Sequence, residues 1–251
     1  KYIYKKVHKK TNPKINLRFE LYIYYFILIG KVKEAVCNEE LKYYLIIVAT
    51  AVILIFINIS STYKSMWHGL RDIVFTVSSV ITTTGFSTAD FGKWPVFSQT
   101  ILLLLMFFGA CAGSTAGGLK ISRVIMMTKM FFAEIKQMIS PNRIVSIKYE
   151  DKPLDSRVKK GVANYFIVYM GIFTVLLLVV SITTDDFLTA FSAVAATFNN
   201  IGPGLGKVGP AFSFADMTDL SKIFLSFGML AGRLELFPML ILFAPGTWKI
   251  K

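Results

Sequence analysis

The stretch Phe75–Gly85, FTVSSVITTTG, decides the fold predicted for this chain. It follows a polar start at residues 64–72, and it is shorter than the roughly 20 apolar residues that a membrane span needs. The run then ends in three threonines and a glycine. This pattern predicts a helix that enters the membrane and stops there, followed by a re-entrant loop at Thr82–Gly85.

A second segment has the same organisation. Two aspartates precede the small apolar run Phe187–Phe198, which ends in the turn-forming sequence Asn199–Gly204, NNIGPG. The glycines that end the two runs, Gly85 and Gly202, lie 202 − 85 = 117 residues apart. Internal repeats in membrane proteins commonly place the functional site at the repeat interface. Both loops are therefore candidates for one shared site.

Longer apolar runs flank both segments. Hydrophobic residues make up 54% of the chain and charged residues only 17%, whereas soluble domains carry about 25% charged residues. The runs expected to cross or enter the bilayer are residues 43–60, 95–109, 119–138, 162–183 and 220–243. We predict an all-α membrane protein with two span–pore-loop–span repeats, re-entrant filter loops and one broken helix.

The formal charge of +13 raises the question of nucleic-acid binding, since a basic surface is its usual footprint. The basic residues lie between apolar runs, however. From residue 120 to residue 160 there are ten Lys and Arg against four Asp and Glu. Basic loops face the cytoplasm in membrane proteins, so this connection is predicted to be cytoplasmic and no nucleic acid is expected.

Four regions are expected along the chain. Residues 1–42 form a basic segment with a partial helix at Leu17–Gly30, residues 43–138 one repeat, residues 139–158 a cytoplasmic linker and residues 159–251 another repeat. The chain begins with Lys1 and its basic start has no apolar signal-sequence core. We expect it to be a piece of a longer protein.

The two loops carry chemistry suited to a cation. Rings of backbone carbonyls that replace a hydration shell form potassium-selective filters, and glycine permits the backbone conformations that such loops need. The negative ends of the two short helices also favour a cation. An ordinary extracellular turn is the alternative for either loop alone. The predicted filter residues are Thr82, Thr83, Thr84, Gly85, Asn199, Asn200, Ile201 and Gly202.

A third irregular element is Gly109–Gly118, GACAGSTAGG, which interrupts an apolar helix. Irregular backbone survives at membrane depth only where it lines a cavity or is buried in protein. The spacing of Gly113 and Gly118 approaches that of a phosphate-binding loop, but Leu119-Lys120 replaces the Lys-Ser/Thr pair and no strand precedes it. We predict a flexible gate beneath the filter, with Gly109, Gly113, Gly117 and Gly118 as its glycines.

Arg233 is the charged residue with the strongest functional expectation. A charge within a membrane span is costly and is by default a functional candidate. Glu235 is two residues away on the predicted helix and would not face it. We therefore expect the guanidinium of Arg233 to find its partner elsewhere, for example on carbonyls of Gly109–Gly118.

No catalytic or metal-binding constellation is recognisable. The two histidines and two cysteines are scattered, and there is no Ser-His-Asp set, paired catalytic acid or Cys-rich metal motif. We predict that the chain is not an enzyme and needs no cofactor beyond the transported ion.

Five motifs resemble the bacterial Trk/Ktr potassium transporter superfamily, and specifically the Trk-type membrane subunit. They run in the same order as in that family and extend over the chain from about Leu17 to its end. They are SVITTTGFSTADF at 79–91, GACAGSTAGG at 109–118, AFSA at 190–193, NNIGPGLG at 199–206 and GRLE at 232–235.

The resemblance implies four span–pore-loop–span repeats around one pore, of which this chain holds the third and fourth, the C-terminal half. It implies potassium at the backbone carbonyls of Thr83, Thr84, Asn200 and Ile201, a gating loop at Gly109–Gly118 and a gating arginine at Arg233. It further implies a multi-pass protein of the bacterial cytoplasmic membrane, a homodimer, and a cytosolic nucleotide-binding regulatory subunit.

Two other functions stay open from the residues alone. The broken helix is also a feature of coupled secondary transporters, where it binds another solute. A non-conducting fragment is the third possibility, because repeats one and two are missing and half a pore cannot surround an ion. Potassium uptake through a carbonyl-lined filter is the function that the sequence favours.

Overall fold

The computed structural model describes residues 38–60, 63, 65–112, 114–141, 146–150, 152–234 and 236–243. The basic segment Lys1–Lys14 and the partial helix expected at Leu17–Gly30 lie outside these residues. The described helices are α4 (Glu39–Ile59), α5 (Met66–Ile81), α6 (Val96–Leu105), α7 (Ile121–Ile139), α8 (Ser156–Thr183), α9 (Phe187–Phe198), α10 (Asp219–Arg233) and α11 (Leu236–Phe243).

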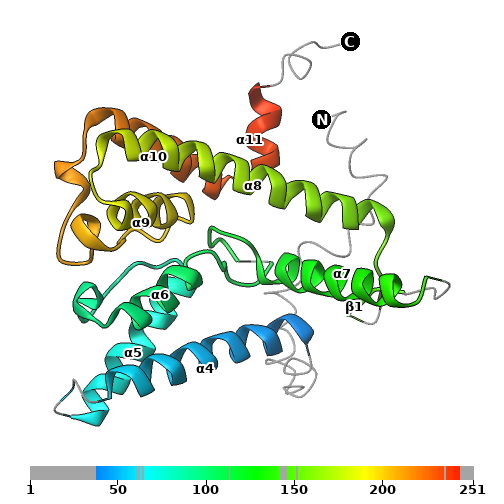
Figure 1. Ribbon diagram of the computed structural model, residues 1–251, viewed down its shortest axis with the longest axis horizontal. Helices are drawn as coiled ribbons and strands as arrows, with labels where there is room; N and C mark the ends of the chain where they lie inside the picture. Colours follow the sequence, from blue (N-terminus) through cyan, green and yellow to red (C-terminus); the bar gives the residue numbers. More distant parts are fainter. Residues whose placement is uncertain are drawn as a thin grey trace, which may run out of the picture.

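The helices form two groups, one for each predicted repeat (Figure 1). In the first group α4 packs on α5 and α6, and in the second α9 packs on α8 and α10. Helix α7 contacts both α4 and α8 and so joins the groups. The all-α class predicted from the sequence is confirmed.

Short elements connect the helices. The antiparallel strands β1 (Lys148–Tyr149) and β2 (Lys152–Pro153) form a small hairpin in the linker that the sequence did not predict. Turns of 3₁₀ helix, η1 (Phe91–Lys93), η2 (Gly206–Val208) and η3 (Phe214–Asp216), follow the two short helices.

Two described helices, α4 and α8, are long and apolar enough to cross a bilayer. Helix α4 has 21 residues, so it is about 30 Å long, the thickness of a hydrocarbon core. Asn38 caps it by accepting a hydrogen bond from the Leu41 amide (3.2 Å). Its outer face is apolar rather than polar, as expected for a surface that meets lipid.

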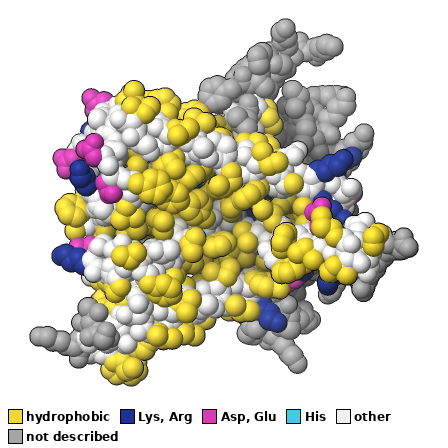
Figure 2. Space-filling model, in the orientation of Figure 1, with side chains coloured by type: hydrophobic (Ala, Val, Ile, Leu, Met, Phe, Trp, Pro, Cys, Tyr) yellow, Lys and Arg dark blue, Asp and Glu magenta, His cyan; other side chains and the backbone are white. Residues whose placement is uncertain are grey.

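The same apolar character extends over the surface. Figure 2 shows hydrophobic side chains over much of the face in view, while most charged side chains lie near its left and right edges. Large exposed side chains include Ile57 on α4 and Ile182 on α8. A broad apolar surface between two charged margins is typical of a membrane-embedded protein.

The last predicted span is broken, which corrects the prediction of one helix over 220–243. Helix α10 ends at Arg233 and α11 begins at Leu236. Pro238 lacks an amide hydrogen, and in a continuous helix that amide would bond to the carbonyl of Leu234. In the first turn of α11 no such bond is needed. Arg233 consequently lies at a helix end and not in the middle of a span.

The burial of residues on α4 predicts that alanine substitutions at two of its isoleucines will have very different effects on stability. Ile55 is 0% exposed and Ile57 is 68% exposed. In the full-length protein encoded by the gene that contains this sequence, Ile55→Ala should lower the free energy of unfolding by about 2–5 kcal/mol, because it leaves a core cavity. Ile57→Ala should change it by less than about 1 kcal/mol, since surface changes are small.

Detergent-solubilised protein unfolded by heat or denaturant provides the measurement. Equal losses of stability in the two variants would contradict the packing of α4 described here.

Candidate ion filter and gating loop

The loops at the ends of α5 and α9 have positive φ angles at matching positions. Thr83 and Gly85 have φ angles of 55° and 77°, and Asn200 and Gly202 have φ angles of 57° and 108°. Positive φ is uncommon for residues other than glycine, so its occurrence at Thr83 and Asn200 is informative. Both pairs are separated by 117 residues, because 200 − 83 and 202 − 85 give the same difference.

The hydrogen bonds of the two loops also match. The Thr84 amide donates to the Ser79 carbonyl (2.9 Å), and the Ile201 amide donates to the Ala196 carbonyl (2.8 Å). The amides of Gly85 and Gly202 donate to the same two acceptors, each at 3.4 Å. The loop amides are thus turned back onto their own helices. Among the described residues, the carbonyl oxygens of 82–85 and 199–202 accept no hydrogen bond.

The two loops touch each other at Gly85. A Cβ atom on Gly85 would collide with the carbonyl oxygen of Ile201 and lie 3.2 Å from Cδ of Pro203. A Cβ on Gly202 would meet nothing within 4 Å. Gly85 is therefore required by both its positive φ and the close approach of the second loop, whereas Gly202 is required by φ alone.

Side-chain hydrogen bonds hold the second loop, residues 199–202, against the helices around it. The Tyr169 hydroxyl donates to Oδ1 of Asn199 (2.6 Å), and Nδ2 of Asn199 donates to the Ala195 carbonyl (2.8 Å). Nδ2 of Asn200 donates to the Met229 carbonyl (3.0 Å). Both asparagine side chains hold the loop to its surroundings, and the backbone carbonyls of the two residues remain available for a ligand.

The threonines of the first loop act in the same way. The Thr82 hydroxyl donates to the Ser78 carbonyl (2.6 Å) and is 2.8 Å from the Thr84 hydroxyl. A threonine hydroxyl in such a loop can either bind the ion or hold the backbone in place. The contacts of Thr82 and Thr84 are those of braces.

The helix break predicted at Gly109–Gly118 is present. Helix α6 ends at Leu105, and the chain re-enters a helix only at Ile121. Two backbone hydrogen bonds join the two ends of the loop. The Gly109 amide donates to the Leu119 carbonyl (2.8 Å), and the Leu119 amide donates to the Phe107 carbonyl (3.0 Å). Gly113 lies outside the described residues.

The glycines of this loop permit close approach to the second filter loop. A Cβ on Gly117 would collide with the carbonyl oxygen of Asn199, and a Cβ on Gly109 would collide with the Gly117 carbonyl. Gly118 has a φ of 74° and lies close to the side chain of Asn199. The loop therefore lies directly against the end of α9, next to the candidate filter.

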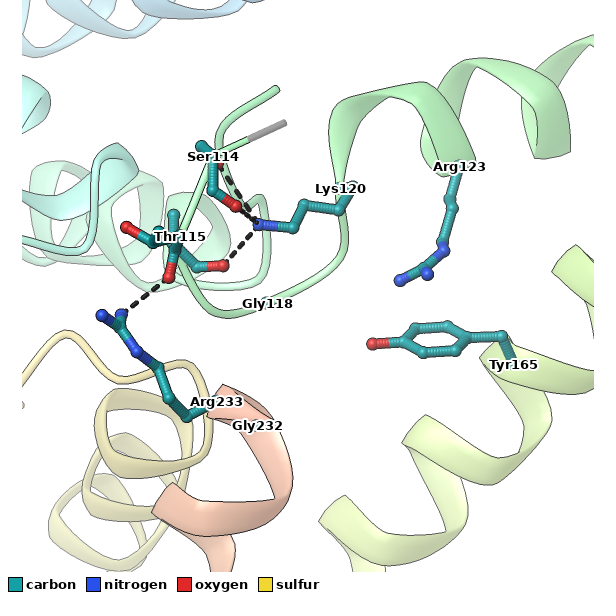
Figure 3. A pocket seen from close by; sticks show the side chains of 9 residues that line it. Ser114, Thr115, Gly118, Lys120, Arg123, Tyr165, Gly232 and Arg233 are labelled. Carbon is teal, nitrogen blue, oxygen red and sulfur yellow. Dashed lines mark hydrogen bonds between the residues drawn. The ribbon is translucent and has the colours of Figure 1, made fainter. Parts of the chain in front are cut away.

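Two cationic side chains bind carbonyls of the loop, as Figure 3 shows. Nη1 of Arg233 donates to the Thr115 carbonyl (2.7 Å). Nζ of Lys120 donates to the carbonyl (2.8 Å) and hydroxyl (3.2 Å) of Ser114 and to the Ala116 carbonyl. The expected type of partner for Arg233, a carbonyl of Gly109–Gly118, is the one found.

Lys120 is the residue that sequence reasoning missed at this site. From the sequence it contributes to the membrane orientation and to the comparison with a phosphate-binding loop, and no role at the gate is predicted for it. Its exposure is 8%, and a buried lysine beside a break in an apolar helix is itself a functional signal. The charge directly after Gly117-Gly118-Leu119 could have identified it.

A cavity of about 100 Å³ lies between the loop, α7, α8 and α10. The guanidinium of Arg123 lies over the ring of Tyr165, 3.8 Å from its centroid. Three positively charged side chains thus surround one cavity close to the filter. Its lining residues are Ser114, Thr115, Ala116, Gly118, Lys120, Arg123, Tyr165, Gly232 and Arg233.

Asp186 has the role of a helix cap. Its carboxylate accepts hydrogen bonds from the Thr189 hydroxyl (2.6 Å), the Thr189 amide (3.0 Å) and the Leu188 amide (3.3 Å). These bonds, that of the Thr189 hydroxyl first, lower the pKa of Asp186 below its ordinary value. This geometry supports the role of a helix cap for Asp186 rather than that of a cation-attracting group.

Comparison with known proteins identifies the family. A family model described as TrkH, cation transport protein, matches residues 41–250. The chain belongs to the TrkH family. The family assignment from the sequence is therefore confirmed, and with it the assignment to a multi-pass membrane protein.

Individual members of the TrkH family are similar over most of this chain. The Trk system potassium uptake protein TrkH of Vibrio parahaemolyticus is 42% identical over 188 residues, which are 75% of this chain and 38% of that protein. TrkG of Escherichia coli, also a Trk system potassium uptake protein, is 35% identical over 240 residues, 92% of this chain and 48% of that protein.

A solved structure has the same fold. The crystal structure of the potassium transporter TrkH from Vibrio parahaemolyticus matches with a TM-score of 0.83 and 36% identity, over 92% of this chain and 50% of that one. The chain spans less than half the length of the two relatives above. The assignments of individual filter and gating residues stay predictions.

Glycines in two helices give a matched test of the site packing. A Cβ on Gly232 would collide with the Phe198 carbonyl, whereas a Cβ on Gly171 would meet nothing within 4 Å. Gly232→Ala should lower the free energy of unfolding by about 1–3 kcal/mol through overpacking. Gly171→Ala should leave it unchanged or raise it by up to about 1 kcal/mol, because alanine is the better helix former.

Unfolding of the two full-length variants in detergent measures the difference. A stabilising effect of Gly232→Ala equal to that of Gly171→Ala would contradict the contact between α10 and the end of α9.

Proposed function

We propose that this chain forms the C-terminal half of a potassium-conducting protein and supplies two of its pore loops. The observation that carries the proposal is the pair of loops 117 residues apart with matching positive φ angles and matching hydrogen bonds. Such agreement between two segments of different sequence favours a common task. The family supplies the substrate class, because its curated members are potassium uptake proteins.

The proposed ligands are the backbone carbonyls of Thr83, Thr84, Asn200 and Ile201. Because the amides of both loops are used by helical bonds, the carbonyls remain available to replace water around a dehydrated cation. The carbonyl ends of α5 and α9 add partial negative charge at the same place. Potassium is the substrate of this site, and no further cofactor is required.

The proposed gate is the loop Gly109–Gly118. Its contact with Asn199 places it beside the second filter loop. The positive charges of Lys120 and Arg233 are held there by loop carbonyls and oppose the passage of another cation. Conduction then requires that the loop and these charges move aside.

A complete pathway needs two further pore loops, which we assign to the first and second repeats of a four-repeat protein. The division at 43–138, 139–158 and 159–251 stays our proposal for the present chain, as do a homodimer, a cytosolic nucleotide-binding regulatory subunit and a location in the bacterial cytoplasmic membrane. In this role the protein is an ion transporter and not an enzyme.

Uptake of rubidium and sodium into liposomes tests the proposal. The full-length protein should take up rubidium, a potassium substitute, in preference to sodium, while the present chain alone should take up neither. If the full-length protein transports neither ion, the proposed cation pathway is wrong. Transport of another solute in place of rubidium would instead favour a coupled secondary transporter.

Serine substitutions at the two loop glycines should reduce uptake. Gly85→Ser introduces a Cβ against the Ile201 carbonyl and strains a positive φ, whereas Gly202→Ser only strains φ. We expect rubidium uptake to fall about tenfold or more for Gly85→Ser and less for Gly202→Ser, since a strained φ costs roughly 1–3 kcal/mol. Normal uptake by both variants, at normal expression, would refute the filter assignment.

Removal of the charge at Arg233 should increase leak. Arg233→Ala breaks the bond to the Thr115 carbonyl and removes a positive charge near the pathway. We expect basal rubidium flux to rise several-fold, because an interaction with a charged group contributes roughly 1.5–3 kcal/mol. Arg157→Ala, at the exposed start of α8, is the matched control. Equal flux through the Arg233→Ala and control proteins would argue against the gating role.

A further inference from the structure

The first turn of α4 contains a buried carboxylate that the filter and gate do not explain. Glu40 is 1% exposed, although it is only the second residue of a long apolar helix. Burying a charge is costly unless it is hydrogen-bonded. The reason for its burial must therefore lie in the groups that it contacts.

One of those groups lies within the gating loop and the other lies just after it. Oε1 of Glu40 accepts a hydrogen bond from the Ala112 amide, inside the loop (2.7 Å). The same oxygen accepts one from the Ser122 amide, in the first turn of α7 (3.2 Å). Between these two attachment points the chain runs through the carbonyls that bind Lys120 and Arg233.

The adjacent carboxylate has different partners. Glu39 forms an ion pair with Lys129 of α7, and its Oε2 accepts a hydrogen bond from the Glu150 amide in the β1–β2 hairpin (3.3 Å). Asn38 also donates to the Glu150 side chain (3.0 Å). Neighbouring residues of one turn therefore hold two different structures, Glu39 the hairpin and Glu40 the loop.

We propose that Glu40 is a positioning residue that fixes the gating loop to α4. One negative oxygen satisfies two amides that lie ten residues apart, Ala112 and Ser122, and so fixes the span of chain between them. Glu40 binds the loop through backbone amides, whereas Lys120 and Arg233 bind it through backbone carbonyls. The effect of this attachment on gating rests on the function proposed above. The attachment of the loop to Glu40 does not depend on that function.

Chemical labelling of Cys111 tests the anchor without reference to transport. Cys111 precedes Ala112 in the loop and is half-buried, so a charged methanethiosulfonate reagent should modify its thiol faster when the loop is loosened. The full-length protein carries Cys37→Ser, and modification of the peptide containing Cys111 is followed by mass spectrometry. The variants are Glu40→Ala and Glu40→Gln, with Glu39→Ala and Glu39→Gln as matched controls.

The expected result is a faster modification of Cys111 in the Glu40 variants. Glu40→Ala should raise the rate about tenfold, because two hydrogen bonds to a charged group are lost. Glu40→Gln keeps an oxygen acceptor and should raise the rate less. Both Glu39 variants should remain within about twofold of the parent rate, since that carboxylate holds the hairpin.

Two results would overturn the proposal. One is an unchanged rate in both Glu40 variants, and the other is an equal increase in the Glu39 variants, which would indicate general loosening of the turn. If Glu40→Ala fails to yield a monodisperse protein, Glu40→Gln decides alone, and a rate equal to that of the parent refutes the anchor.

Basal rubidium flux separates this inference from the proposed function. A freed loop should raise flux in Glu40→Ala, whereas a purely structural defect would lower it. Faster labelling in a protein that transports no rubidium or sodium would support the anchor and refute the cation pathway. Preferred rubidium transport with unchanged labelling and unchanged flux would support the pathway and refute the anchor.

Discussion

The bonds from Lys120 and Arg233 to carbonyls of the gating loop are the interaction on which the rest of the structure depends. Irregular backbone cannot remain at membrane depth unless its polar groups find partners within the protein. Here the partners are cationic side chains from α10 and from the residue that precedes α7. The break between α6 and α7, and that between α10 and α11, place those charges where the loop needs them.

Close approach of backbone to backbone is the second constraint, and it explains which glycines the chain needs. Gly85 lies against Ile201, Gly117 against Asn199, and Gly232 against Phe198, each at a carbonyl oxygen. A side chain at Gly85 would push the two repeats apart, one at Gly117 would displace the loop, and one at Gly232 would push α10 away from α9. The two positive-φ loops, the segment Gly109–Gly118 and α10 are therefore one packed unit, in which a shift of one backbone segment must move another.

Much of this organisation could be predicted from the sequence because its signals are local. The run Phe75–Gly85 and its counterpart at 187–202 gave the short helices, the loops and the 117-residue repeat, and GACAGSTAGG gave the break. The second break was missed, although Pro238 marked it. The braces Tyr169 and Glu40 act across 30 and 72 or more residues, and no local pattern encodes which distant amide or carbonyl a side chain will meet.

The charges around the loop also limit how such a pathway can open. Under the proposed function, a cation that leaves the filter would approach Lys120 and Arg233, and like charges repel. The same two charges stabilise the loop by binding its carbonyls. A movement of these charges away from the pathway must therefore either break those bonds or move the loop as well. Glu40 holds the loop through its amides. If the loop moves together with the charges, the hydrogen bonds to Glu40 must therefore break too.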